Sequence, residues 1–225
     1  LLPDLRAGGV ERIRITIARE LVMRGHHVEF VLMKAQGDLM AEVANEFPVV
    51  DLQCSKIRYL PASLAKYIKK IQPDSLLVAM WPLTVVAPMM RIIGFRGRVV
   101  ISEHCSLSSQ YQDAGAIHRI VLHATMAIGY RLASARIGVS NGVVEDIARL
   151  SGLGRHSFHV IYNPVSPRVA PTRETLAAIH SLWPVGKGPR ILTVGRMKQQ
   201  KNHALLLRSF SALRMPNLSL MIVGT

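Results

Sequence analysis

The stretch Gly195–Asn202, which reads Gly-Arg-Met-Lys-Gln-Gln-Lys-Asn, joins an apolar run typical of a strand to an apolar run typical of a helix. Its three cations, Arg196, Lys198 and Lys201, therefore fall in a strand-to-helix turn. The first amide protons of a helix are unpaired and the peptide dipoles add there, so this end of a helix is already positive. An anion would be held by these amides and by the side chains together, which predicts a phosphate site. On charge alone, a solvated basic turn is the alternative.

The same strand–turn–helix pattern extends from this stretch over the whole chain. Strand 190–194, helix 204–214 and strand 218–223 form one βαβ unit around the turn. Continuous apolar strands alternating with helices predict an α/β fold, in which parallel sheets are covered on both faces and ligands bind at the carboxyl ends of strands. We predict further helices over 10–24, 38–46, 61–71, 82–93, 113–134, 140–150 and 173–182, and further strands over 1–5, 27–33, 49–52, 75–80, 99–102, 135–139 and 158–162.

The composition changes between residues 166 and 188, where prolines and glycines bracket a short helical piece. We interpret 166–188 as a linker between a first domain over 1–165 and the start of a second domain over 189–225. One βαβ unit cannot bury both faces of a sheet, so we expect the second domain to be truncated here. The chain also begins on Leu1 and not on Met, as expected where preceding residues are missing.

Composition and charge exclude several classes of protein. The 225 residues are 49% hydrophobic, which excludes a disordered chain. The longest uncharged run, 75–90, is shorter than the ~18–20 residues that span a bilayer, and charged residues interrupt the apolar N-terminal stretch, so we expect neither a transmembrane helix nor a secretory signal. Cys54 and Cys105 lie far apart, which predicts free thiols in a reducing cytosol.

The net charge of +14, from 28 basic and 14 acidic residues, favours an acidic partner: nucleic acid, an anionic membrane face or phosphorylated substrates. Five tyrosines and five phenylalanines with no interleaved basic–aromatic run argue against a nucleic-acid surface. The helical region 113–134 and its C-terminal flank carry cationic and polar residues on an apolar background, which is typical of a face lying on anionic lipid; an ordinary solvated face is the alternative. These residues are His118, Arg119, His123, Tyr130, Arg131 and Arg136.

Two further motifs lie where a parallel sheet would bind a ligand. Gly8-Gly9 would let a phosphate approach the backbone, but it lacks the third glycine of a dinucleotide fingerprint, so a structural tight turn is the alternative. Ser102-Glu103-His104 follows a strand, where His104 could bond a sugar hydroxyl or phosphate, or be satisfied by neighbouring backbone. Glu103 could be a catalytic carboxylate, a cap or part of a salt bridge. We find no metal-ligand cluster, nucleophile elbow or Walker loop.

Taken together and in this order, these pieces resemble the family 4 glycosyltransferases of the GT-B fold, which has two Rossmann-like domains facing a cleft. The resemblance covers essentially the whole chain, and the Gly-Arg-x4-Lys-Asn segment is its most specific part. The matching segments are Gly8-Gly9-Val10-Glu11-Arg12, His26-His27-Val28, Ile101-Ser102-Glu103-His104, Gly138-Val139-Ser140, Val160-Ile161-Tyr162-Asn163-Pro164-Val165 and 195–202.

The resemblance implies retaining transfer of a sugar from a nucleotide-diphosphate sugar to a glycan or lipid-linked acceptor, in polysaccharide or lipopolysaccharide biosynthesis, with neither metal nor cofactor. By resemblance, Arg196 and Lys201 would clamp the donor diphosphate and stabilise the charge of the leaving group, and His104 would contact the sugar. The implied catalytic residues are Arg196, Lys201 and His104, and the implied diphosphate-binding residues are Gly8, Gly9, Gly195, Arg196 and Lys201.

The chain departs from the family pattern in two places. The Glu-x7-Glu segment of the family would fall after Thr225, so we expect the chain alone to be inactive, and the usual acidic residue before strand 135–139 is replaced within 132–136. We expect a cytoplasmic protein, peripheral on the cytoplasmic face of the membrane. The alternatives are a non-catalytic phosphate- or nucleotide-binding module and another GT-B enzyme, such as a nucleotide-sugar epimerase.

Overall fold

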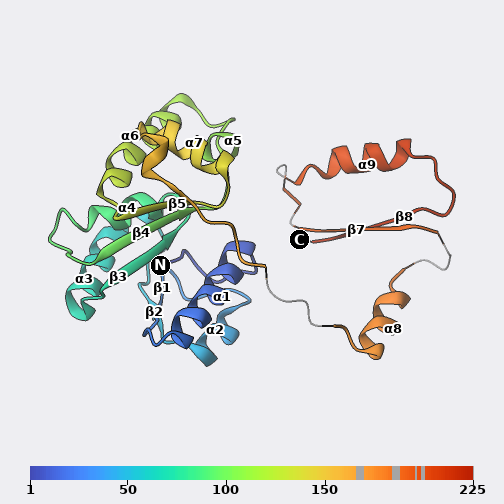
Figure 1. Cartoon of the computed structure of the whole chain (residues 1–225), viewed down its shortest axis with the longest axis horizontal. Coiled ribbons are helices and arrows are strands. Elements are labelled where there is room, and N and C mark those ends of the chain that lie inside the picture. The colour runs from blue at the N-terminus through green and yellow to red at the C-terminus, as the bar shows by residue number, and fades with distance from the viewer. Residues whose placement is uncertain (166–169, 184–187, 196, 199–200, 225) are drawn as a thin grey trace. The chain divides into compact units, whose positions relative to one another are not determined.

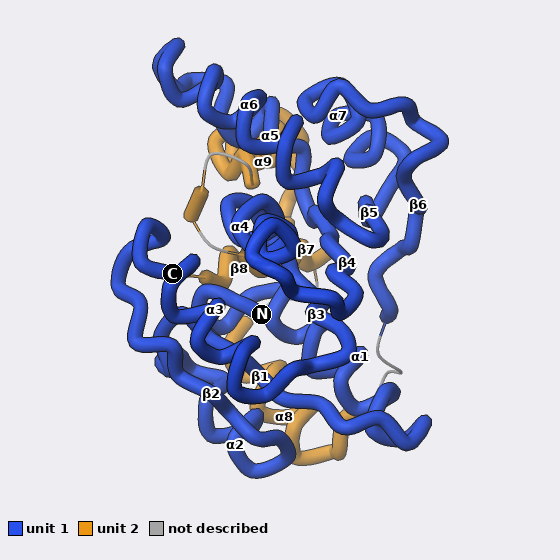
Figure 2. The backbone as a smooth tube through the Cα atoms, turned by 90° about the vertical axis from the view of Figure 1, so that its left-hand side faces the viewer, with its two compact units in different colours: residues 1–166 blue, residues 167–225 orange. Residues whose placement is uncertain are grey.

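The computed structural model describes residues 1–165, 170–183, 188–195, 197–198 and 201–224 (Figure 1). The chain divides into two compact units, Leu1–Ser166 and Pro167–Thr225, which Figure 2 colours separately. The domain boundaries read from the composition remain a prediction, and each unit is described by itself below.

Unit 1 contains two parallel sheets. In the smaller sheet, β1 (Phe30–Leu32) pairs with β2 (Val49–Asp51). The larger sheet has four strands in chain order: β3 (Ser75–Ala79), β4 (Arg98–Glu103), β5 (Ala135–Gly138) and β6 (His159–Val160). All pairs are parallel, as the continuous apolar strands predict.

The leading segment of the chain lies between these two sheets. Leu2 forms a parallel bridge with Leu32 of β1, and the nitrogen of Leu1 donates to the carbonyl of Leu77 in β3 at 2.7 Å. The strand predicted over 1–5 is therefore reduced to a single bridge. Backbone hydrogen bonds of this segment to β1 on one side and to β3 on the other still connect the two sheets.

Helices follow the strands as the alternation predicts. One helix, α5, was not predicted because it has only four residues. The helix predicted over 82–93 is shorter than expected, since α4 ends at Met89 and the chain continues in turns to Gly94, where φ is +97°. The helices of unit 1 are α1 (Gly9–Met23), α2 (Met40–Glu46), α3 (Leu60–Ile71), α4 (Leu83–Met89), α5 (Leu107–Gln110), α6 (Ala116–Leu132) and α7 (Asn141–Ser151), with short 3-10 helices at Ile57–Tyr59 and Arg155–Ser157.

Two clusters of buried side chains hold unit 1 together. One lies around the four-stranded sheet and includes residues of α3, α4, α6 and α7; the other joins β1 to α1 and α2. Helices α4 and α6 approach closely, since a Cβ added at Gly129 of α6 would lie 2.7 Å from Cα of Val85 in α4. Ser140 caps α7 as predicted, its side chain accepting from the amide of Val143 at 3.3 Å. Both cysteines are free thiols, as predicted, and their reducing compartment stays a prediction.

Unit 2 consists of α8 (Arg173–Ser181) and a βαβ unit made of β7 (Arg190–Val194), α9 (His203–Ala212) and β8 (Ser219–Val223). The two strands are parallel, in register from Arg190 opposite Ser219 to Val194 opposite Val223. No described residue of this unit is fully buried. That is expected of one βαβ unit, which cannot cover both faces of its sheet. Among the described residues of the whole chain, no helix has the length and apolarity needed to cross a membrane.

Candidate functional site

The carboxyl end of β4 carries the cluster that the sequence placed at a ligand-binding edge. Arg14 reaches this edge from α1, donating to the carbonyl of Val78 at 3.3 Å and to Oγ of Ser102. The same Oγ lies 3.1 Å from Nε2 of His104. Ser102 therefore links the guanidinium of α1 to the imidazole that follows β4.

His104 is partly buried, and its environment disfavours the charged imidazolium. Burial, together with the positive charge of Arg14, lowers the pKa of His104 to about 4. The Asn163 side chain acts to raise the pKa of His104, although no hydrogen bond of good geometry joins Asn163 to the ring. The ring nitrogen Nδ1 is buried and has no hydrogen-bond partner among the described residues. His104 is thus a neutral imidazole near pH 7, able to accept or donate a hydrogen bond.

Glu103 points the other way, into the core. Its side chain is fully buried, and Oε1 accepts from Oγ1 of Thr84 at 2.5 Å and from the Tyr130 hydroxyl at 2.7 Å. Oε2 accepts from the backbone amide of Trp81 at 3.3 Å. Burial raises the pKa of Glu103 to about 7 although these hydrogen bonds act to lower it. The expectation of a cap or a salt bridge is wrong, because this carboxylate joins the end of β4 to Trp81, to α4 and to α6.

Gly8 and Gly9 lie at the start of α1, in the same unit. Gly8 is the extended N-cap residue and Gly9 opens the helix. A Cβ added at Gly9 would meet nothing within 4 Å, so the space above this turn is open to a ligand. The carboxylate of Glu11 lies against Gly8 and would have to move away before an anion approached that residue.

The basic turn lies in unit 2, between β7 and α9. The amide of Gly195 donates to the carbonyl of Val223 at 2.8 Å, which fixes the end of β7 against β8. The Lys201 side chain lies over Gly195, with its Cε 3.2 Å from the position of an added Cβ. Asn202 caps α9, accepting from the amide of Leu205 at 3.3 Å, and no acidic residue occupies the first turn of this helix. The predicted clamp residue Arg196 lies outside the described residues.

The structure thus brings together Gly195 with Lys201 in unit 2, and places His104, Gly8 and Gly9 in unit 1. Three residues of the β4 cluster were missed in the sequence: Arg14, Thr84 and Tyr130. Burial in the structure, and not the spacing of apolar residues alone, locates two of them on their helices. Arg14 precedes buried Ala18 by four residues, and Tyr130 follows buried Met126 by four, so each lies on the inward face of its helix.

In the face predicted over 113–134 and its flank, Tyr130 is buried, so the prediction is wrong for that residue. Arg119, His123 and Arg131 are exposed, and their contact with lipid stays a prediction. Tyr130 is buried on Glu103, and the His118 ring contacts Trp81 and Tyr111, with centroids 5.5 and 4.8 Å away. The remaining internal contacts join His123 Nδ1 to Leu150 O at 3.1 Å, Arg131 to Ser151 O at 3.1 Å and Arg136 to Ala133 O at 2.9 Å.

Within the described part of the chain, no group of three or more histidine, cysteine or acidic side chains is placed to hold a metal ion. Metal independence of the reaction stays a prediction.

Comparison with known proteins identifies the family. The sequence model of Glycosyltransferase Family 4 matches residues 7–169, more than half of the chain. The chain belongs to this glycosyltransferase family. The resemblance based on motif order is therefore confirmed.

One curated relative and several solved structures match the family 4 chain. The relative is the N-acetylgalactosamine-N,N'-diacetylbacillosaminyl-diphospho-undecaprenol 4-alpha-N-acetylgalactosaminyltransferase of Campylobacter jejuni, 25% identical over 234 residues that cover 98% of this chain and 60% of that protein. The chain therefore spans about three fifths of the length of this relative.

The solved structures share the fold. Anabaena Alr3699/HepE in complex with UDP matches with a TM-score of 0.74 and 17% identity, over 98% of this chain and 59% of that one. The same protein with UDP-glucose matches with a TM-score of 0.74 and 16% identity, over the same shares of both chains. The predicted fold class, α/β of GT-B type with parallel sheets, is confirmed.

Proposed function

We propose that this protein is a glycosyltransferase that moves a sugar from a nucleotide-diphosphate sugar to a lipid-linked or glycan acceptor, with retention at the anomeric carbon. The observation that carries the proposal is the turn after β7, where Lys201 lies over Gly195 at the N-terminus of α9 in a family 4 chain. The Campylobacter jejuni relative is named for a diphospho-undecaprenol-linked substrate, and the Anabaena structures hold UDP and UDP-glucose, which supports both substrate classes.

In this reaction the bond between the anomeric carbon and the diphosphate oxygen breaks, and the nucleoside diphosphate leaves with the electron pair. A bond forms between the anomeric carbon and an acceptor hydroxyl oxygen, whose proton passes to the departing diphosphate or to water. Negative charge therefore grows on the diphosphate. The ammonium of Lys201, with the guanidinium of Arg196 and the amides of α9, would stabilise this charge without a metal ion.

His104 would contact the transferring sugar. A neutral imidazole can accept a hydrogen bond from a sugar hydroxyl at Nδ1 or Nε2 without placing a second positive charge beside Arg14. Gly9 would leave room for the diphosphate or the acceptor above the first turn of α1.

A membrane surface belongs to the same proposal, since a lipid-linked acceptor resides in a bilayer. We place the enzyme at the cytoplasmic face of the membrane. The net charge of +14 supports this place, because anionic headgroups attract basic proteins.

Calorimetric titration with UDP, GDP and ADP sugars tests the proposal. We expect one class of donor to bind, and Lys201→Ala or Arg196→Ala to weaken binding by about tenfold or more, since each removes a charged contact with the diphosphate. Arg208→Ala, an exposed cation on the same helix α9, is the matched control and should bind as the wild type does. Absence of binding to every donor, or equal binding by all variants, would refute the proposal.

Transfer to an acceptor separates the enzyme from its alternatives. Binding of a nucleotide sugar by the full-length protein with no transfer under any condition would favour the non-catalytic binding module. Conversion of the donor sugar to its epimer would favour the epimerase.

A further inference from the structure

Helix α6 is apolar on two sides, and only one of them faces the core. Leu122, Met126 and Tyr130 are fully buried and belong to the cluster around the four-stranded sheet. A second set of apolar residues recurs at spacings of three and four, so it forms one strip along the helix. This exposed strip consists of Ile117, Ile120, Val121, Ala124 and Ile128.

The exposed strip leaves large side chains in solvent. Ile117 is 80% exposed, Ile120 67% and Ile128 55%. Contiguous exposed aliphatic side chains of this kind usually mark an interaction site. The strip contains no aromatic residue, although aromatic residues are the usual anchors of protein–protein interfaces.

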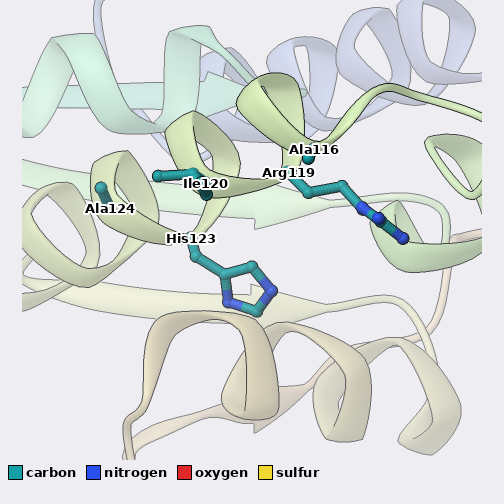
Figure 3. A pocket seen from close by; sticks show the side chains of 5 residues that line it. All are labelled: Ala116, Arg119, Ile120, His123 and Ala124. Carbon is teal, nitrogen blue, oxygen red and sulfur yellow. The ribbon is translucent and has the colours of Figure 1, made fainter.

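A shallow depression lies on the same helix, lined by Ala116, Arg119, Ile120, His123 and Ala124. Figure 3 shows these five side chains on consecutive turns of α6, with Arg119 and Ile120 extending in opposite directions. Arg119 lines the same depression as Ile120 and Ala124 of the strip, and its long side chain can reach an anionic group while the isoleucines enter an apolar layer.

Acidic residues are absent from α6 and from the neighbouring helix α4. The sequence contains no acidic residue between Asp113 and Glu145, a range that includes all of α6. Helix α4 packs against α6, and the range between Asp74 and Glu103 that includes it is equally free of acidic residues. Just after α4, Arg91 bonds Ser134 Oγ at 3.0 Å and is followed by the exposed pair Ile92 and Ile93.

These observations favour one occupant. A cationic and apolar surface without carboxylates complements an anionic bilayer, whose headgroups attract arginine and whose acyl boundary accepts isoleucine. We propose that the exposed strip of α6 is the membrane-contacting surface of this protein, with its isoleucines in the acyl boundary and Arg119 at the lipid phosphates. The inference rests on the proposed function, since a lipid-linked acceptor requires contact with a bilayer.

Co-sedimentation with vesicles tests the surface. Vesicles of phosphatidylcholine and phosphatidylglycerol should bind the protein, and Ile117→Ser/Ile120→Ser should weaken partitioning by about tenfold or more, because two large aliphatic side chains no longer leave water. Arg119→Glu should also weaken it. The matched control is Val22→Ser/Met23→Ser, which changes residues that are 48% and 75% exposed at the end of α1 and should partition as the wild type does.

Three results would overturn the inference. One is a wild-type protein that does not sediment with anionic vesicles, and another is a strip variant that sediments as the wild type does. The third is a dimer in analytical ultracentrifugation that the strip variant abolishes without any change in vesicle binding, since the strip would then bind a second copy. Circular dichroism confirms that each variant is folded.

Titration of the strip variant with the nucleotide sugar separates this inference from the proposed function. Loss of vesicle binding by Ile117→Ser/Ile120→Ser with unchanged donor binding supports both proposals. If the wild type binds the donor but does not bind vesicles, only the proposed membrane surface is refuted. If the wild type binds vesicles but no donor, the proposed function is refuted and the proposed membrane surface is supported.

Discussion

At the scale of single residues, the protonation of Glu103 makes the stability of the folded state depend on pH. Its pKa is raised to about 7 from an ordinary value of 4.5, mainly by burial, so between these values the folded chain binds the proton more tightly than the unfolded chain. The contribution of Glu103 to stability is therefore fully present below about pH 4.5 and is lost as the pH rises through 7. The same carboxylate holds four parts of unit 1 together, so this loss affects the end of β4, where His104 begins.

Replacing Glu103 by glutamine removes this titration. We expect the wild type to lose about 3 kcal/mol of unfolding free energy relative to Glu103→Gln between pH 4.5 and pH 8, because each pKa unit corresponds to about 1.4 kcal/mol. Urea unfolding of both proteins across this range measures the difference, in which the other titrating groups cancel. A difference that stays constant with pH would contradict the raised pKa of Glu103.

At the scale of elements, the close approach of α4 and α6 depends on Gly129. A Cβ at this position would lie 2.7 Å from Cα of Val85, so Gly129→Ala should push the helices apart and lower the free energy of unfolding by about 1–3 kcal/mol. Gly142→Ala in α7 is the control, because nothing lies within 4 Å of its added Cβ and alanine favours a helix by up to about 1 kcal/mol. Thermal unfolding of both variants tests this, and an unchanged midpoint for Gly129→Ala would contradict the packing.

The spacing of apolar residues predicted most helices and strands, because this spacing depends only on residues that are close in the sequence. It could not decide which side of α6 faces the core, since that helix is apolar on two sides. Tyr130 was therefore assigned to an exposed face, although Thr84 and Glu103, both distant in the sequence, meet it in the core. The partners of Glu103 come from two places far apart in the chain, residues 81–84 and Tyr130, and no local pattern predicts such a set.

At the scale of the whole molecule, the order of the motifs along the chain predicted the fold class and the family better than any single site. Gly8-Gly9 or His104 alone left a structural alternative open in each case. The structure adds contacts that spacing cannot give, such as Lys201 over Gly195 and Arg14 joined to His104 through Ser102. The roles proposed for Arg196, Lys201 and His104 stay predictions.

The two units differ in burial, which predicts different local stability. Val144 and Ile147 of α7 are fully buried in unit 1, whereas no described residue of unit 2 is fully buried. Local opening needs little free energy where few apolar contacts are lost, so amides of α9 should exchange with deuterium at least about tenfold faster than those of α7. Added nucleotide sugar should slow exchange at the start of α9, where the diphosphate would bind, and leave α7 unchanged. Hydrogen–deuterium exchange with mass spectrometry measures both effects. Equal exchange in α7 and α9 would contradict the first expectation, and slower exchange confined to unit 1 would place the donor away from Lys201.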